Sequence, residues 1–292
     1  MSTVGVIGLG HMGRGMALAL QHDGWAVVGT DASPAARQAL AGERMAVVDS
    51  ITEVAARADV IVLSLPTAAV VTQVITGKDG LLAAGRPGQL VIDTSTSHPD
   101  TTRVLAGLLA GAGMALIDAP VSGSPKAALA GQLTMLLGGD AADLARAEPV
   151  LVTLSAKRVR VGGVGAGHVA KIANNLLCAA HLIAAGEVAQ LADRAGVDMA
   201  QLLEGINAGS GRSGVTQTNF PTWILNNAFD SGFTMKLMRK DVRLAAELVG
   251  QAGLDLPLTA EVARLWEESA ESIDDGEDFN RIVELGRDHQ PD

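Results

Sequence analysis

The segment Val4-Gly5-Val6-Ile7-Gly8-Leu9-Gly10-His11-Met12-Gly13 decides the fold of this 292-residue chain. A short apolar run leads directly into the pattern Gly-x-Gly-x-x-Gly, and an amphipathic stretch follows. Taken alone the glycine pattern is weak, because the chain contains 34 glycines. In this context it predicts a strand, a tight turn and a helix, which together form the phosphate-binding unit of a dinucleotide fold.

The glycines of this pattern have separate physical roles. Gly8 permits the tight turn, Gly10 lets the backbone approach a pyrophosphate, and Gly13 lets the helix and the strand pack closely. The N-terminus of the helix adds N–H groups and a partial positive charge for the phosphates. The other cofactor-binding residues predicted in this pattern are Leu9, His11 and Met12, and His11 is expected to face the cofactor or solvent.

An acidic residue, Asp31, ends the next predicted strand about 20 residues after the glycines, as a dinucleotide fold requires. Its carboxylate would accept hydrogen bonds from the adenosine ribose and repel a 2′-phosphate. The next residues, Ala32 and Ser33, offer no arginine for that phosphate, so the sequence favours NAD. Arg37 lies one helical turn further on and leaves NADP as the less favoured alternative.

Short apolar runs alternate with amphipathic stretches through the first half of the chain, which is typical of βαβ units around a parallel sheet. Strands are predicted at Val4–Gly8, Ala26–Asp31, Val60–Leu65, Leu90–Asp93, Ala115–Asp118, Thr134–Gly138 and Arg158–Val161. Helices predicted between them include Met12–His22, Pro34–Ala41 and Asp100–Ala110. We therefore expect an α/β Rossmann-type domain over residues 1–163.

After Val161 the pattern changes to helical periods, which predicts an all-α C-terminal domain over residues 164–292. The glycine cluster 162–167 is expected to turn the chain into a long helix that ends near Ala195, before Gly196. Further helices are predicted at Met199–Ala208, Thr234–Ala252 and Pro257–Ser272. The acidic stretch Asp274–Asp278 is expected to be a solvated turn before a short terminal helix.

Composition narrows the class of protein. The net charge of −10 argues against a general nucleic-acid binder. The single cysteine excludes a disulfide framework and a cysteine-built zinc site, and it suits a reducing cytosol. There is no room for a signal peptide before Val4–Ile7, and no unbroken apolar run reaches the roughly 20 residues of a membrane span. We expect a cytoplasmic protein without a metal, a nucleic-acid partner or a membrane partner.

Lys171 is the one fixed charge between Arg160 and Glu187, in a run that otherwise reads as a buried helix. Burying an ammonium group is costly unless something compensates it. Asn174 and Asn175 follow at the i+3 and i+4 positions that share its helix face. The pattern predicts a catalytic or ligand-holding group, and the alternative is a lysine that extends to the surface.

Further motifs follow in order along the chain: Asp93-Thr94-Ser95-Thr96, Asp118-Ala119-Pro120-Val121-Ser122-Gly123, Gly165-Ala166-Gly167 before Lys171, and Lys240-Asp241-x-x-Leu-Ala. With the first glycine pattern they resemble the β-hydroxyacid dehydrogenase family, which includes 3-hydroxyisobutyrate dehydrogenase and tartronate semialdehyde reductase. The resemblance covers nearly the whole chain. It implies an NAD-dependent oxidoreductase that interconverts a small 3-hydroxy acid and its semialdehyde or keto form. It also implies a homodimer or homotetramer built on the C-terminal helices.

The resemblance implies a role for each matching residue. Lys171 matches the general acid/base, and Asn175, with Asn174 beside it, matches the group that positions the substrate. The segment that binds the substrate carboxylate corresponds to Ser122, Gly123 and Ser124. Lys240 and Asp241 would close over the cofactor from the helical domain, and Lys240 would also reach the substrate. The residues expected to line the nicotinamide are Leu65, Pro66, Ser95 and Thr96.

A lysine near its ordinary pKa of about 10.4 is a poor base at neutral pH. Burial of Lys171 among Ile172, Leu176 and Leu177 would disfavour the charged form and so lower the pKa of its amine. In the reducing direction the protonated amine would instead donate to the nascent alkoxide.

One departure from the family pattern concerns the substrate. Many members have Ser-Gly-Gly where this chain has Ser122-Gly123-Ser124, so the Ser124 side chain would add a hydroxyl donor or narrow the pocket. Arg212 is either a grip on the substrate acid or an ordinary surface arginine. Two other functions stay open: a non-catalytic NAD-binding protein of the same fold, and an imine reductase-like enzyme. Imine reductases usually carry Asp or Tyr where Lys171 stands.

Overall fold

The computed structural model describes residues 3–286 and separates the chain into two compact units, Met1–Lys171 and Ile172–Asp292. The division falls inside helix α9 (Ala166–Arg194), because this helix begins in the first unit and continues into the second. The sequence places the domain boundary a few residues earlier, where the glycine cluster precedes α9.

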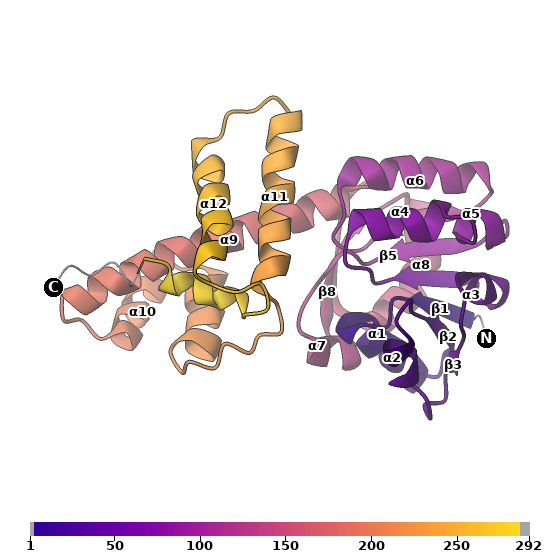
Figure 1. The fold of residues 1–292 in the computed structure, drawn as a ribbon, viewed down its shortest axis with the longest axis horizontal. Helices are drawn as coiled ribbons and strands as arrows, with labels where there is room; N and C mark the ends of the chain where they lie inside the picture. Colours follow the sequence, from indigo (N-terminus) through magenta and orange to yellow (C-terminus); the bar gives the residue numbers. More distant parts are fainter. Residues whose placement is uncertain (1–2, 287–292) are drawn as a thin grey trace. The chain divides into compact units, whose positions relative to one another are not determined.

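A nine-stranded sheet forms the centre of the first unit (Figure 1). Its strands are β1 (Thr3–Ile7), β2 (Ala26–Thr30), β3 (Ala46–Val47), β4 (Val60–Leu63), β5 (Leu90–Asp93), β6 (Ala115–Asp118), β7 (Val121–Ser122), β8 (Leu133–Gly138) and β9 (Ser155–Gly162). Their order is β3-β2-β1-β4-β5-β6-β8-β7, with β9 paired to β8.

The direction of the strands changes at one end of this sheet. Strands β1 to β6 pair in parallel with one another, as expected for a Rossmann-type fold. Strand β8 pairs antiparallel with β6 and β7, and β9 pairs parallel with β8. The expectation of a parallel sheet therefore holds for β1 to β6 and is wrong for this edge.

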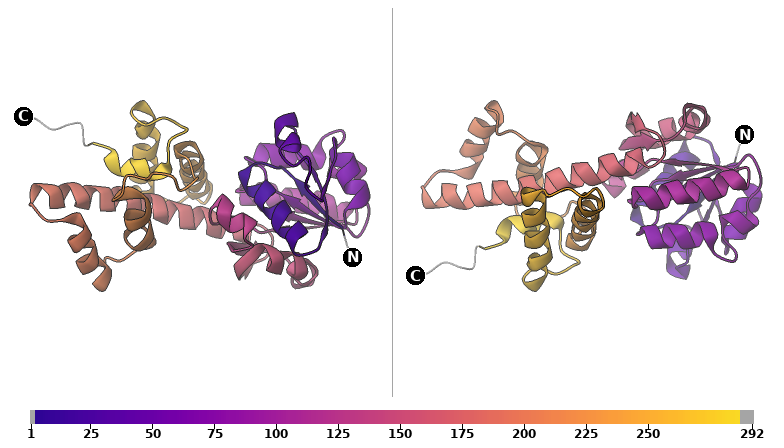
Figure 2. Two further views of the ribbon diagram at one scale, coloured as in Figure 1. Left: turned by 90° about the horizontal axis from the view of Figure 1, so that it is seen from below. Right: turned by 90° about the horizontal axis from the view of Figure 1, so that it is seen from above.

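Helices cover both faces of the sheet (Figures 1 and 2). They are α1 (His11–His22), α2 (Pro34–Gln38), α3 (Ile51–Arg57), α4 (Ala68–Thr76), α5 (Leu81–Ala84), α6 (Pro99–Gly111), α7 (Pro125–Leu129) and α8 (Ala141–Leu154). Side chains of α1, α7 and α8 pack in one buried cluster, and those of α3 to α6 pack in another. Strands β1, β2, β4, β5 and β6 thus lie in a buried middle layer, whereas β9 at the edge is mostly exposed.

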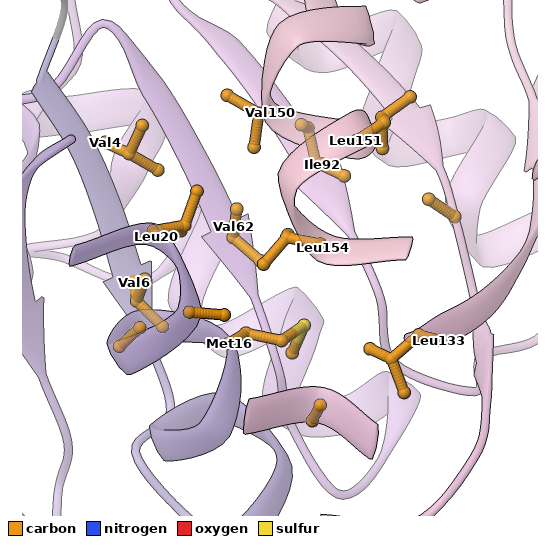
Figure 3. Close-up of a cluster of buried hydrophobic side chains, with 14 of the residues drawn as sticks. Val4, Val6, Met16, Leu20, Val62, Ile92, Leu133, Val150, Leu151 and Leu154 are labelled. Atoms are coloured by element: carbon orange, nitrogen blue, oxygen red, sulfur yellow. The ribbon is translucent and has the colours of Figure 1, made fainter. Parts of the chain in front are cut away.

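The central strands β1, β4, β5 and β6 read as continuous apolar runs because both of their faces are buried. Successive side chains of a strand point to opposite faces. In β1, Val4 and Val6 join the cluster with Met16 and Leu20 of α1, as Figure 3 shows, whereas Ile7 joins the cluster on the other face. This two-sided burial is the reason the sequence predicted most of these strands.

The second unit is helical and packs around the fully buried Trp266 and Phe220. It contains the remainder of α9, followed by α10 (Met199–Ala208), the π-helix η1 (Val215–Ile224), α11 (Met235–Gln251), α12 (Pro257–Glu268) and the 3₁₀ helices η2 (Ser269–Glu271) and η3 (Phe279–Glu284). The rings of Phe233 and Phe279 meet edge to face, 5.4 Å apart. No named strand occurs between residues 163 and 286, as the sequence predicts.

The acidic stretch Asp274–Asp278 differs from its predicted solvated turn at one residue. Residues 274–277 are exposed, but Asp278 is buried. Its carboxylate accepts hydrogen bonds from the Ser231 N–H at 2.7 Å and from the Asn280 N–H at 3.0 Å. The contact with Ser231 joins residues that are far apart along the chain, which a local acidic pattern does not reveal.

Helix α9 has 29 residues and is long and apolar enough to cross a membrane. The buried core helices of globular proteins also reach this length and hydropathy. In the most apolar stretch of 18 residues in α9, a third is buried inside the structure. In the second unit Ala179 and Leu182 of this helix are fully buried in the helical core. Part of its apolar surface therefore serves the packing of a globular domain.

Candidate active site

The turn between β1 and α1 depends on its glycines. Gly8 has a φ of +96°, and a Cβ atom there would lie 2.2 Å from the Ser64 carbonyl oxygen. A Cβ atom on Gly13 would lie 1.8 Å from the Gly8 carbonyl oxygen, so the predicted close packing is present. Gly10 is exposed, and its Cβ position has nothing within 4 Å. The turn thus leaves room for a ligand at Gly10 and none at Gly13.

Asp31 lies directly after β2, and its carboxylate is fixed by two backbone donors. The Leu9 N–H donates to one oxygen at 2.6 Å, and the Ser33 N–H donates to the other at 2.7 Å. The Leu9 side chain is buried in the core, whereas His11 is exposed and Met12 is half-buried. Leu9 instead orients the acid through its backbone.

Arg37, the residue that would favour NADP, is engaged with two neighbours. Its Nη1 donates to the Asp31 carbonyl oxygen at 2.6 Å, and its Nε lies 3.3 Å from Asp49 Oδ1. A carboxylate therefore already compensates the positive charge near the end of β2.

Two buried carboxylates lie side by side at the carboxyl ends of β5 and β6, where Asp93 and Asp118 are in register. Asp118 accepts hydrogen bonds from the N–H groups of Gly165 at 2.6 Å and His168 at 3.0 Å, which begin helix α9. A Cβ atom on Gly138 or Gly167 would come within 3 Å of this carboxylate. Burial raises the pKa of Asp118, although the charge of His168 and the two N–H donors act against it.

Asp93 contacts both α9 and a predicted cofactor loop. His168 Nε2 lies 3.4 Å from its Oδ2, and the Ser95 N–H donates to its Oδ1 at 3.0 Å. Burial would raise the pKa of Asp93, but the contact with His168 and the Ser95 donors outweigh it and lower that pKa. The charged carboxylate therefore stabilises the protein at neutral pH, and this contribution is lost as the pH falls through the lowered pKa.

The two loops predicted to line the nicotinamide are joined to each other. The Leu65 N–H donates to Ser95 Oγ at 3.0 Å. Leu65 and Thr96 are half-buried, Ser95 is buried and Pro66 is exposed. The loops after β4 and β5 are therefore held together at the carboxyl edge of the sheet.

Lys171 is buried, with 8% of its surface exposed, and its Nζ donates to Ser122 Oγ at 3.0 Å. The structure thus brings together the predicted acid/base and the predicted carboxylate-binding segment. The expectation that Lys171 is buried among apolar side chains holds only in part. Ile172 is buried, but Leu176 is half-buried and Leu177 is 59% exposed, because it lies on a different face of the helix.

The departure at Ser124 has a structural explanation. Ser124 is the N-cap of α7, and its Oγ accepts a hydrogen bond from the Ala127 N–H at 3.2 Å. Serine is a favoured N-cap residue because its hydroxyl satisfies an otherwise unpaired N–H. Gly123 before it is exposed and has a φ of +138°, a conformation that favours glycine. The hydroxyl of Ser124 thus has a structural role that the sequence analysis missed.

The second unit contains its own group of predicted site residues. Asn175 Nδ2 donates to Asp241 Oδ2 at 2.6 Å, and Asn174 Nδ2 donates to Asn175 Oδ1 at 3.1 Å. Lys240 Nζ lies 3.2 Å from Asp241 Oδ1. Asn175 and Asp241 are buried, whereas Asn174 is exposed. This network connects α9 to α11. Its centre is the buried carboxylate of Asp241, which contacts Asn175 and Lys240.

Arg212 is exposed in the segment between α10 and η1. Across residues 3–286 no group of three or more His, Cys, Asp or Glu side chains is arranged to hold a metal ion.

Comparison with known proteins identifies the family. Residues 3–163 match the family described as the NAD binding domain of 6-phosphogluconate dehydrogenase. Residues 165–285 match the family described as the NAD-binding domain of NADP-dependent 3-hydroxyisobutyrate dehydrogenase. The probable 3-hydroxyisobutyrate dehydrogenase of Mycobacterium tuberculosis is 37% identical over 97% of both chains. The chain belongs to the 3-hydroxyisobutyrate dehydrogenase family.

One further relative and two solved structures are similar to this chain along nearly its whole length. The 2-(hydroxymethyl)glutarate dehydrogenase of Eubacterium barkeri is 33% identical over 97% of this chain and 94% of its own length. The structure of 3-hydroxyisobutyrate dehydrogenase from Mycobacterium tuberculosis with L-serine has a TM-score of 0.92 at 36% identity, over 98% of this chain and 99% of that one. An imine reductase from a Pseudomonas species shares the fold, with a TM-score of 0.65 at 19% identity over 97% of this chain and 98% of its own.

The expected Rossmann-type domain, helical domain and family are therefore confirmed. The chain is an NAD-dependent 3-hydroxyacid dehydrogenase. The match to an NAD-binding domain family covers residues 3–163, which include the glycine turn.

Two alanine substitutions separate packing from cofactor binding in the glycine turn. Gly13→Ala would force a methyl group against the Gly8 carbonyl, so we expect a loss of about 1–3 kcal/mol in unfolding free energy and a lower Tm. Gly10→Ala should keep the wild-type Tm but weaken NADH binding, because the methyl group enters open space beside the helix N-terminus. Thermal melts and NADH fluorescence titrations measure both. Equal Tm values for the two variants, or an unchanged NADH affinity for Gly10→Ala, would contradict these roles.

Proposed function

We propose that this enzyme interconverts a small 3-hydroxy acid and its semialdehyde or keto form, with Lys171 as the general acid/base. The contact between Lys171 Nζ and Ser122 Oγ carries this proposal. It sets a buried proton-transferring group beside the segment proposed to bind the substrate carboxylate. The names of the relatives, 3-hydroxyisobutyrate dehydrogenase and 2-(hydroxymethyl)glutarate dehydrogenase, support this substrate class.

The residues of the first unit fit a dinucleotide. The open position at Gly10, the N–H groups at the start of α1 and the carboxylate of Asp31 match a pyrophosphate and a ribose diol. When bound, NAD(H) accepts or supplies the hydride. The residues proposed to contact it beyond the glycine turn are Leu65, Pro66, Ser95, Thr96, Lys240 and Asp241.

The chain's own residues would then handle the proton and hold the acid. In the oxidising direction the neutral amine of Lys171 takes the hydroxyl proton of the substrate, and in the reducing direction its ammonium returns that proton to the alkoxide. Ser122 orients Nζ through its hydrogen bond, and the exposed Gly123 is proposed to bring the backbone close to the substrate carboxylate. Asn175, with Asn174 beside it, is proposed to position the reacting oxygen.

Substitution of Lys171 tests the acid/base role. We expect Lys171→Ala to lower kcat by about 10²–10⁴-fold, because it removes the proton-transferring group. NADH binding, measured by fluorescence, should stay close to that of the wild type. Lys171→Arg is the matched control, since arginine keeps the charge but does not deprotonate in proteins. If Arg restores activity, charge rather than proton transfer is what the site needs.

A substrate panel accompanies this measurement. NADH formation is followed with 3-hydroxyisobutyrate, L-serine, glycerate and threonate, and each substrate is run with NAD and with NADP. Turnover of at least one acid that is lost in Lys171→Ala supports the proposal. Silence across a wide panel, with NAD still bound, would instead indicate a non-catalytic NAD-binding protein.

We also propose that NAD is preferred over NADP. The carboxylate of Asp31 is held at the end of β2, and Asp49 and a backbone carbonyl engage the nearby Arg37. Negative charge at this position disfavours a 2′-phosphate.

Removal of that charge should change the cofactor preference. Asp31→Asn is expected to reduce the ratio of kcat/KM with NAD to kcat/KM with NADP by about 10–100-fold, which corresponds to the loss of a hydrogen bond to a charged acceptor. Asp59→Asn is the matched control, because it removes the same charge before β4, at the opposite end of the sheet. An unchanged ratio in Asp31→Asn would contradict the proposed contact with the ribose.

We further propose that the enzyme is cytoplasmic. We also propose that it forms a homo-oligomer through the C-terminal helices. Exposed side chains on α9 recur every three or four residues and form one stripe, which we call the α9 stripe: Leu177, His181, Ala184, Val188 and Leu191. Leu177 and Leu191 are 59% and 68% exposed. This spacing is typical of a helix seam that packs against another helix.

Charge on the α9 stripe should dissociate the oligomer. We expect the double variant Leu177→Glu/Leu191→Glu to have the mass of a smaller assembly than the wild type in light scattering coupled to size-exclusion chromatography. Val152→Glu is the control, since Val152 is 51% exposed on α8 of the first unit. An unchanged mass in the double variant would mean that copies do not associate along this face.

A further inference from the structure

The buried imidazole of His168 has no role in the proposed chemistry. It lies on α9 three residues before Lys171, so the two side chains share one helix face. His168 is fully buried, and buried polar groups are costly unless they meet a partner. Its Nε2 faces Asp93 Oδ2 at 3.4 Å, and Asp93 is buried as well. Removing a histidine and a carboxylate from water costs free energy, so apolar side chains would fill the same space at a lower cost.

Asp93 connects this pair to the loops proposed to line the nicotinamide. Its other oxygen accepts the N–H of Ser95, whose hydroxyl in turn accepts the N–H of Leu65. A continuous series of contacts therefore leads from the loop after β4, through Ser95 and Asp93, to His168 in the helix that carries Lys171.

The backbone of the same helical turn is anchored separately. Asp118 accepts the N–H groups of Gly165 and His168, which holds the beginning of α9 against the sheet without any side chain of the helix. The imidazole of His168 is thus not needed to attach the helix. Its contact with Asp93 instead connects the helix to the loops after β4 and β5.

We propose that His168, through Asp93, is a positioning residue. It holds Lys171 at a fixed position relative to the loops that are proposed to hold the nicotinamide. This inference rests on the proposed acid/base role of Lys171. Proton transfer requires hydrogen-bond reach to the substrate oxygen, and a displacement of about 1 Å can cost about 10²-fold in rate. The residue touches neither substrate nor cofactor in this proposal, so its effect appears in kcat rather than in dinucleotide affinity.

The test compares His168→Leu with His168→Gln, whose side-chain amide offers an N–H donor to Asp93. For His168→Leu we expect kcat to fall by about 10–100-fold, while the NADH dissociation constant stays within about twofold of the wild type. His168→Gln should recover most of the lost kcat. His22→Leu is the matched control, because His22 is exposed at the end of α1, and its kcat should equal that of the wild type.

A second variant covers the case in which His168→Leu does not fold, since it leaves Asp93 buried without its partner. The double variant His168→Leu/Asp93→Asn removes the buried charge as well and should melt near the wild-type Tm, yet show the same loss of kcat. A wild-type kcat in folded His168→Leu or in the double variant, or no recovery in His168→Gln, overturns the inference.

Lys171→Ala is measured in parallel so that the two proposals can fail separately. An inactive Lys171→Ala together with a fully active His168→Leu overturns only the positioning role. A fully active Lys171→Ala overturns the acid/base assignment on which that role rests.

Discussion

The rest of this structure depends on the anchoring of helix α9 by two buried carboxylates at the carboxyl edge of the sheet. Asp118 accepts the backbone N–H groups that begin the helix, and Asp93 faces the side chain of His168 in the same turn. Carboxylates are stabilised at a helix N-terminus by its unpaired donors and partial positive charge. Glycine at positions 138 and 167 is required because a Cβ atom there would occupy the space of the Asp118 carboxylate.

The positions of the candidate catalytic groups follow from this anchor. With the first turn of α9 fixed, Lys171 reaches Ser122 at the end of β7, and Asn175 follows one helical turn later in the second unit. There Asp241 accepts the Asn175 amide and faces Lys240. A single helix therefore carries residues of both units, and each of them is held by a buried or half-buried polar partner.

Elements with a strong local pattern were predicted well, and elements without one were missed. Strands β5 and β6 and helix α10 have their predicted bounds because an apolar run or a helical period ends at a clear polar or glycine boundary. Strands β3 and β7 have two residues each, which is too short for any period. The π-helix η1 contains Pro221, a residue that argues against a helix in sequence. Its buried residues, including Phe220, hold it in the helical core.

The sequence by itself determined the dinucleotide-binding fold, the change to a helical second half and the selection of Lys171 as the candidate acid/base. Such features depend on hydrophobic periodicity, on the steric demands of glycine and on a charge in an apolar helix, which are all local. Only the tertiary structure decided the partners of the buried and charged side chains: Asp93 with His168, Asn175 with Asp241, and Arg37 with Asp49. The physical reason is that these partners are far apart along the chain or on separate elements, and folding selects them by the cost of leaving polar groups unpaired.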